Sequence, residues 1–164
     1  MIKAPEIKIL DKNAEYYGVP TSTLMENAGK AIADFIYKKL KPKNENIIIF
    51  CGTGNNGGDG FVAARYLLKN YNVTIILVGK ENDIKTDISK ENFYKLKKMD
   101  IKIYQINSLK LIDKILSKND IIIDSILGIG LKGSLSEPYI GLVNKINKSK
   151  KNNCFSGCTN RIWM

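Results

Sequence analysis

The chain has 164 residues, about the length of one domain with a buried core. Apolar residues make up 44% of it and charged residues 26%, a composition typical of globular proteins. Its apolar runs are far shorter than the roughly 20 residues that cross a bilayer, and its first residues lack an apolar signal-peptide core. We therefore expect a cytoplasmic protein with no membrane segment.

The formal net charge of +10 could indicate a nucleic-acid partner, because basic surfaces bind phosphate. However, Arg65 and Arg161 are the only arginines, and the lysines are spread over predicted helix surfaces. We prefer a solvated basic surface and do not expect nucleic acid as a partner. Three cysteines without any histidine predict neither a disulfide framework nor a zinc site.

In chain order, the sequence first predicts a short helix over 5–17 that ends at Gly18, followed by a helix with an apolar stripe that begins after Pro20. Thr23 and Glu26 have the spacing of a capping box at the start of this second helix. Strands and helices then alternate. The predicted strands are Ile47–Cys51, Val73–Val78, Ile101–Ile106 and Ile121–Asp124, and the predicted helices cover 59–69, 86–99, 108–117 and 138–148.

The predicted strands are short, β-branched and apolar on both faces, as expected for a parallel sheet covered by helices on both sides. Alternating strands and helices predict an α/β fold. The fold class we expect is a Rossmann-like, doubly wound parallel sheet in three α/β/α layers.

A glycine-rich loop follows the first predicted strand, at the edge of the sheet where such folds bind ligands. Gly52, Gly54 and Gly57 fit G-x-G-x-x-G, the pattern that lets backbone approach a diphosphate. The next helix can offer its first N–H groups to an anion. This loop predicts a phosphate-bearing ligand, and the absence of Lys-Ser or Lys-Thr after it excludes a P-loop.

Two features of the loop do not suit an ordinary dinucleotide site. Asn55 and Asn56 place amide groups that can donate, accept or coordinate a cation, and Asp59 places a carboxylate near the start of the helix. Asp59 has the alternative interpretation of a simple helix cap, which would stabilise by about 1 kcal/mol.

The segment GTGNNGGDGFVAARYL (52–67) resembles the hallmark of the YjeF N-terminal domain family, the NAD(P)H-hydrate epimerases. TLMENAGKAIA (23–33) is similar to the family's N-terminal helix, and IIIDSILGIGLKGSLSEPY (121–139) to its second signature. The resemblance covers about residues 5–150. It implies an isomerase that interconverts the R and S forms of hydrated NADH or NADPH, as part of nicotinamide nucleotide repair.

By this resemblance, Asn56 and Asp124 would hold a potassium ion, for which amide and carboxylate oxygens are suitable ligands. Asp124 could also be a turn-forming cap after its strand. The resemblance further implies a homodimer and functional coupling to an ADP- or ATP-dependent dehydratase. The residues it implies for substrate binding are Asn55, Asn56, Gly57, Gly58, Asp59, Gly128, Ile129, Gly130, Leu131, Lys132, Gly133 and Ser134.

The C-terminal residues depart from the family pattern, which has a further strand that ends in a motif like V-D-[IV]-P-[ST]-G. The aspartate of that motif would be the acid or base, so the catalytic residue of this chain is not identified. Residues after Lys150 hold no apolar run, proline or aspartate. We therefore expect an incomplete domain over 1–150 that lacks its C-terminal strands, an aberrant and disordered tail over 151–164, and little activity.

The genetic code offers an explanation for this departure. Back-translated and read one nucleotide downstream, residues 152–164 can encode TIVSVDVPTG, with the aspartate codon across Gly157 and Cys158. We take a frameshifted end as our hypothesis.

Two other interpretations remain open. A Rossmann dehydrogenase would place Glu81 or Asp83 on a ribose, although the chain is short for a substrate domain and holds no histidine. A noncatalytic module that binds a nucleotide or RNA would suit the basic charge.

Overall fold

The computed structural model describes residues 4–39, 45–106, 109–128, 137, 139–149 and 152–155. Its centre is a parallel sheet with the strand order β3-β2-β1-β4-β5. This order begins like that of a doubly wound Rossmann-type sheet and confirms the predicted fold class. The strands are β1 Asn46–Cys51, β2 Asn72–Leu77, β3 Lys102–Gln105, β4 Ile121–Ser125 and β5 Asn152–Phe155.

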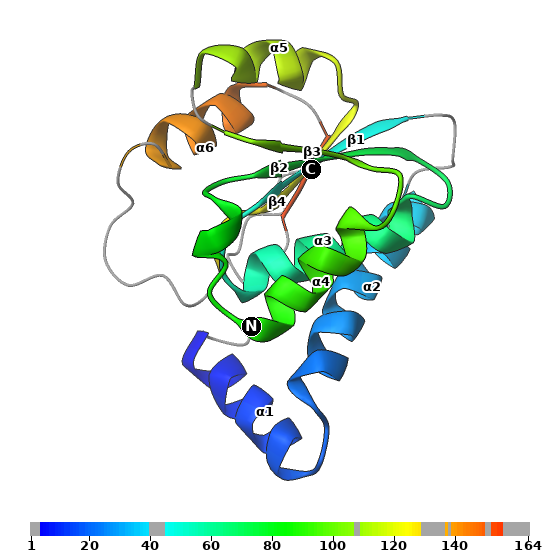
Figure 1. Ribbon diagram of the computed structural model, residues 1–164, viewed down its shortest axis with the longest axis vertical. Coiled ribbons are helices and arrows are strands. Elements are labelled where there is room, and N and C mark those ends of the chain that lie inside the picture. The colour runs from blue at the N-terminus through cyan, green and yellow to red at the C-terminus, as the bar shows by residue number, and fades with distance from the viewer. Residues whose placement is uncertain are drawn as a thin grey trace.

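Helices cover both faces of the sheet, with α2, α3 and α4 on one side and α5 and α6 on the other (Figure 1). The helices are α1 Ala4–Tyr16, α2 Thr21–Lys39, α3 Asn55–Leu67, α4 Asp87–Lys97, α5 Ile112–Ser117 and α6 Tyr139–Lys148, with short 3-10 turns η1 Glu81–Asp83 and η2 Leu109–Leu111. None of the helices in this described part of the chain is long and apolar enough to cross a membrane.

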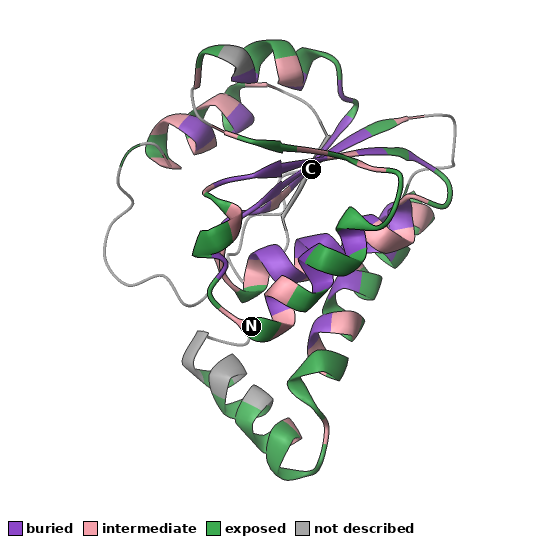
Figure 2. Ribbon diagram, viewed as in Figure 1, coloured by how far each residue is buried: buried purple, intermediate pink, exposed green. Residues whose placement is uncertain are grey.

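Alternate residues of the strands build two separate cores, because successive side chains of a strand point to opposite faces. In β1, Ile47 and Ile49 pack with α2, α3 and α4, whereas Ile48 and Phe50 pack with α5 and α6. All four are fully buried, and the buried residues in Figure 2 line the two sides of the sheet. The chain thus has the expected three layers.

Helix α1 extends away from this body (Figure 1); its last residue is Tyr16, and the chain turns at Gly18, as predicted. Gly18 has a φ of 80°, a left-handed conformation that favours glycine, and its N–H donates to the carbonyl of Glu15. Tyr16, at the end of α1, is 85% exposed.

Helix α2 begins directly after Pro20, as predicted, but without the predicted capping box. The helix begins at Thr21, because the carbonyl of Pro20 accepts the N–H groups of Thr23 and Leu24. Thr23 therefore lies inside the helix, and the predicted capping box with Glu26 is wrong. The side chain of Glu26 instead contacts α3.

Helix α3 begins four residues earlier than the predicted span of 59–69. Gly54 is its N-cap, and Asn55 to Gly58 form its first turn. Asp59 consequently lies in the second turn, so its interpretation as a helix cap is wrong.

The expectation of a disordered tail after residue 150, with the C-terminal strands missing, is wrong over 152–155. These residues form β5, which pairs in parallel with β4 so that Ile121 faces Asn152 and Asp124 faces Phe155. The physical reason is that the outer edge of β4 offers a row of backbone N–H and C=O groups, and an extended segment can pair with them whatever its side chains. Residues 156–164 lie outside the described residues.

Candidate functional site

The carboxyl ends of β1 and β4 lie side by side at the point where the strand order reverses. Phe50 is the register partner of Asp124, and Cys51 is that of Ser125. Beyond the strands, the N–H of Gly52 donates to the carbonyl of Ser125 over 3.0 Å. The glycine-rich loop thus begins beside the loop after β4, at the topological switch point where α/β sheets bind ligands.

Each glycine of the G-x-G-x-x-G pattern has a different environment. A Cβ on Gly52 would overlap the carbonyl oxygen of Ile126, and a Cβ on Gly57 would overlap the carbonyl oxygen of Gly52. No described atom lies within 4 Å of the position of a Cβ on Gly54. The first and third glycines therefore permit close backbone packing, whereas the middle one leaves an approach to the backbone.

Asn56 brings the two loops together. A Cβ on Gly128 would lie 3.2 Å from the Cβ of Asn56 and 3.6 Å from its Oδ1. Gly128 is thus small enough to let the amide of Asn56 lie against the backbone after β4. These two predicted site residues are in contact although they are 72 positions apart in the sequence.

Two carboxylates lie near the end of β1. Burial raises the pKa of Asp124, although its Oδ1 accepts the N–H of Ile126 over 2.9 Å, which acts in the opposite direction. Burial also raises the pKa of the Cys51 thiol well above its ordinary value, and the charges of Asp124 and Asp59 add to this effect. Both carboxylates are therefore close enough to act on the same buried sulfur atom.

The other predicted residues of the glycine-rich loop have different exposures. Asn55 is exposed, Gly57 and Gly58 are buried, and Asp59 is partly buried. The predicted residues Ile129, Gly130, Leu131, Lys132, Gly133 and Ser134 lie outside the described residues. Within the described part of the chain, no three histidine, cysteine or acidic side chains cluster as a metal centre.

Three residues at the start of α4 contact the glycine-rich loop, and the sequence did not predict them as site residues. The Lys85 N–H donates to the carbonyl of Thr53 over 2.8 Å, and the Thr86 hydroxyl donates to Oδ1 of Asn55 over 2.7 Å. The hydroxyl of Ser89, which is fully buried, lies 3.4 Å from the carbonyl of Gly54. The Thr-x-x-Ser spacing at the start of the predicted helix was a signal for a cap, but not for this contact.

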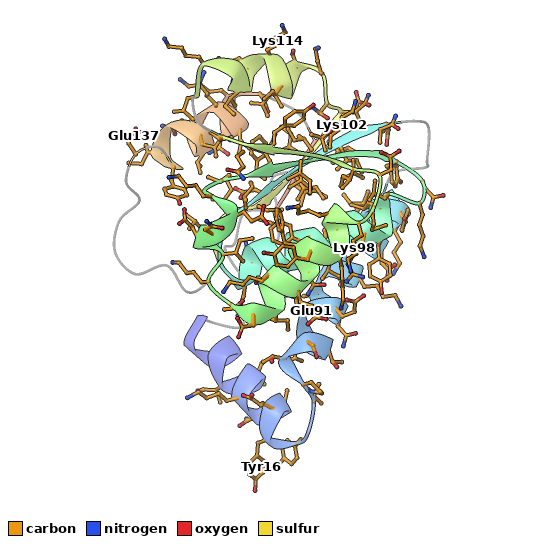
Figure 3. All side chains as sticks on the ribbon, viewed as in Figure 1. Tyr16, Glu91, Lys98, Lys102, Lys114 and Glu137 are labelled. Atoms are coloured by element: carbon orange, nitrogen blue, oxygen red, sulfur yellow. The ribbon has the colours of Figure 1, made fainter. Side chains whose placement is uncertain are left out.

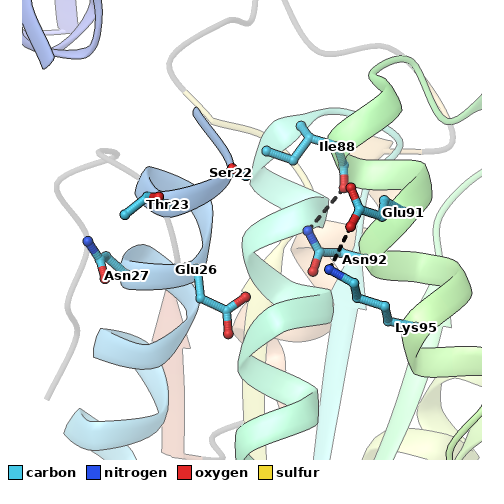
Figure 4. A pocket seen from close by; sticks show the side chains of 8 residues that line it. All are labelled: Ser22, Thr23, Glu26, Asn27, Ile88, Glu91, Asn92 and Lys95. Carbon is cyan, nitrogen blue, oxygen red and sulfur yellow. Dashed lines mark hydrogen bonds and ion pairs between the residues drawn. The ribbon is translucent and has the colours of Figure 1, made fainter. Parts of the chain in front are cut away.

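A polar hollow of about 280 Å³ lies between α2 and α4 (Figure 4). Next to it, Arg65 of α3 donates to Glu26 of α2 and, over 3.0 Å, to Oδ1 of Asn92 of α4. The hydroxyl of Tyr66 also donates to Glu26. None of the predicted site residues lines the hollow, whose lining is Ser22, Thr23, Glu26, Asn27, Ile88, Glu91, Asn92 and Lys95.

Two further observations concern the alternative interpretations as a Rossmann dehydrogenase and as a noncatalytic module that binds a nucleotide or RNA. Glu81, one of the two candidate ribose ligands of a dehydrogenase, forms an ion pair with Lys97, and Asp83 accepts the N–H of Lys80. Basic side chains are distributed over separate elements, as Figure 3 shows for Lys98 after α4, Lys102 of β3 and Lys114 of α5.

Known proteins resemble this chain in sequence over most of its length. The model of the family described as YjeF-related protein N-terminus matches residues 21–156. The chain is 44% identical, over 93% of its length, to a bifunctional NAD(P)H-hydrate repair enzyme, Nnr, of Methanocaldococcus jannaschii, and it spans only 32% of that relative. It is 41% identical, over 77% of its length, to an NAD(P)H-hydrate epimerase of Nitrosopumilus maritimus, of which it spans 58%.

Among solved structures, that of the yeast protein ynu0 is similar, with a TM-score of 0.83. The match covers 95% of this chain and 69% of the yeast chain. Its sequence identity is 24%, so this likeness supports the fold alone. The family match, by contrast, includes the glycine-rich loop, Asp124 and Gly128, which the structure brings to one edge of the sheet. The chain therefore belongs to the family of YjeF-related protein N-termini.

Proposed function

We propose that this chain binds hydrated NADH or NADPH and interconverts the R and S epimers at the hydrated carbon. The observation that carries the proposal is the contact of Asn56 with Gly128, since it joins two glycine-containing loops at the switch point of the sheet. Two relatives that share 41% and 44% of the aligned residues are described as an NAD(P)H-hydrate epimerase and a repair enzyme.

The loop after β1 would bind the diphosphate of the nucleotide. The first N–H groups of α3 have no acceptor within the helix, and they lie at the positive end of the helix dipole. The open position beside Gly54 leaves room for a phosphate oxygen to approach the backbone. Residues of both loops, from Asn55 to Asp59 and from Gly128 to Ser134, would form the substrate site.

A potassium ion would fit between the two loops. Asn56 supplies an amide oxygen and Asp124 a carboxylate, the type of oxygen ligands that hard cations prefer. Burial makes the ionised form of Asp124 costly, and a cation beside it would offset that cost. When bound, the ion would supply positive charge next to the diphosphate.

The proposal includes partners. We expect a homodimer, and we expect the S form to be consumed by an ADP- or ATP-dependent dehydratase. The description of the longer archaeal relative as bifunctional supports this coupling, because this chain spans about a third of that protein.

The direct test measures conversion of the purified R hydrate of NADH to the S form, above the spontaneous rate, by chromatography. Two chains are compared, the 164-residue chain and a variant in which residues 152–164 are replaced by the sequence beginning TIVSVDVPTG. We expect the second chain to be faster, because a proton-transfer group typically contributes about 10²–10⁴-fold. If neither chain exceeds the spontaneous rate, the proposed activity is wrong.

Variants of the faster chain then locate the site. Asn56→Ala should raise KM, whereas Asn82→Ala, which removes an exposed amide from η1, should leave the rate unchanged. Equal kinetics of the two variants would place the substrate elsewhere on the molecule.

A further inference from the structure

Three successive residues of the glycine-rich loop are held from one side by the segment that starts α4. Thr53 accepts the N–H of Lys85 over 2.8 Å, and the carbonyl of Gly54 lies 3.4 Å from the hydroxyl of Ser89. The side chain of Asn55 accepts the hydroxyl of Thr86 over 2.7 Å. These contacts join segments more than 30 positions apart in the sequence, so they arise from the tertiary fold and not from a local turn.

The proton positions in this cluster follow from the chemistry of its atoms. Oδ1 of Asn55 can only accept, so the hydroxyl of Thr86 must donate to it. Thr86 has a single hydroxyl proton, and its oxygen lies 2.8 Å from the hydroxyl of Ser89. The hydroxyl proton of Ser89 has its own acceptors, the carbonyl of Gly54 at 3.4 Å and Oγ1 of Thr86, so the proton of Thr86 is left for Asn55.

The hydrogen bond from Thr86 fixes the orientation of the exposed Asn55 amide. With Oδ1 of Asn55 turned toward Thr86, the two N–H groups of the same amide point away from α4. A free amide can offer either its oxygen or its nitrogen to a ligand, because rotation exchanges them. The bond that Thr86 donates to Oδ1 holds the orientation in which the nitrogen faces away from Thr86.

We propose that Thr86 is a positioning residue that presents the amide NH₂ of Asn55 to the ligand as a hydrogen-bond donor. The group that Asn55 meets is therefore an acceptor, and beside the first turn of α3 this is an oxygen of the diphosphate. The inference rests on the proposed function in that the ligand is a nucleotide with a diphosphate. Ser89 supports the arrangement from its buried position, where its Oγ lies 2.6 Å from the position of a Cβ on Gly58.

Thr86 also caps α4, since its Oγ1 accepts the N–H of Ser89 over 3.4 Å. A test must separate this structural role from the positioning role. Thr86→Val removes both the cap and the donated proton, and Thr86→Ser keeps both. Thr86→Asp keeps the acceptor that caps the helix, but at pH 7 it has no proton to donate to Asn55.

The first measurement needs no ligand. In ¹⁵N–¹H spectra, the side-chain amide signals of Asn55 are identified by their loss in Asn55→Asp. We expect them to shift and to exchange faster with water in Thr86→Val and Thr86→Asp, and to stay in place in Thr86→Ser. Signals that remain unchanged in Thr86→Asp would show that the donated bond does not hold the amide, and would overturn the inference.

The second measurement uses ADP-ribose as the probe, by calorimetry in phosphate-free buffer. Because the orienting hydrogen bond is lost, Thr86→Val should weaken the binding of ADP-ribose about three- to tenfold. Thr86→Ser should bind it with an affinity close to that of the wild type. In a chain that already carries Asn55→Ala, Thr86→Val should have no further effect, since Thr86 acts through Asn55.

The outcomes separate this inference from the proposed function. Suppose that the wild type binds ADP-ribose. If Thr86→Val binds it equally well, or if Thr86→Val weakens binding as much in the Asn55→Ala chain as in the wild-type chain, Thr86 is only a helix cap. The inference then falls, and the proposed function stands. If the wild type binds no ADP-ribose, the proposed function falls and the inference with it.

Discussion

Gly52 and Ile126 contact each other backbone to backbone, so closely that a Cβ on Gly52 would overlap the carbonyl oxygen of Ile126. The contact joins the residue after β1 to the residue after β4. Neither side can yield as a flexible side chain would, because both contacting groups belong to main chain that is anchored in the sheet.

Gly52→Ala should therefore destabilise the chain by about 2–3 kcal/mol, the upper part of the range for overpacked core sites, because backbone atoms overlap. Gly54→Ala is the matched control, since Gly54 has a φ of −99° and no described atom near the position of a Cβ. Because alanine is a poorer N-cap than glycine, the effect of this control should be a cost of about 0.5–1 kcal/mol, smaller than that of Gly52→Ala. Urea unfolding of both variants measures the difference, and similar midpoints would contradict the close contact.

Potassium should stabilise the folded chain if the ion binds between Asn56 and Asp124. At ten times its dissociation constant, a ligand specific for the folded state adds about 1.4 kcal/mol. We expect a higher Tm in potassium chloride than in choline chloride at equal ionic strength, and no such difference in Asp124→Asn. Asp87→Asn, which alters a fully exposed carboxylate of α4, should respond to potassium like the wild type. Retention of the response in Asp124→Asn would argue against the site.

Glu26 should make stability depend on pH. Burial alone would raise its pKa, but the hydrogen bonds from Tyr66 and Arg65 outweigh burial and lower the pKa below its ordinary value of 4.5. A lowered folded-state pKa means that Glu26 stabilises the chain above about pH 4.5, and that this contribution is lost as the pH falls through the folded-state value.

Glu26→Gln should cost about 1–2 kcal/mol near pH 7, below the range for fully buried pairs because the Glu26 side chain is 38% exposed. The difference from wild type should shrink as the pH is lowered past 4.5. Glu91→Gln breaks the exposed pair with Lys95 and should cost only about 0–0.5 kcal/mol near pH 7. Urea titrations at several pH values provide the measurement. A cost of Glu26→Gln that does not vary with pH would refute the assigned pKa shift.

Strand β5 should protect the edge of β4. A chain that ends at residue 151 exposes the backbone groups of β4 that pair with Asn152 to Phe155. Bare strand edges pair with other chains, so this truncation should self-associate at lower concentration than a chain that ends at Phe155. Sedimentation velocity over a concentration series compares the two. Identical behaviour would mean that β5 does not shield the edge.

The sequence was sufficient to predict most of the sheet, because its strands are continuous apolar runs that only a buried position can accommodate. Ile47–Cys51 and Ile121–Asp124 agree with β1 and β4 to within one residue at each end. The polar segment Asn152–Phe155 carried no such signal, since its pairing with β4 depends on the backbone of a neighbour. The composition of a segment does not reveal the strand with which it pairs, and the register partner of Asn152 lies 31 residues away in the sequence.

The candidate site was predictable to a similar extent. The glycine spacing indicated a close backbone approach, and the structure places Gly52 and Gly57 in such positions. The early start of α3 was missed because Asn55 to Gly58 combine residues that favour loops, and the packed sheet overrides this preference. The bond from Thr86 to Asn55 could not be predicted, since it depends on how α4 packs beside α3.

The exposed residues beside Gly18, at the end of α1, are suitable positions for a spectroscopic label. Gly18 turns the chain after α1 in a left-handed conformation, and the family match begins only at residue 21. Tyr16 and Tyr17 are exposed beside this joint and pack edge to face against each other. A fluorophore attached at position 16 or 17 would report the environment of the end of α1 without altering a residue of the glycine-rich loop.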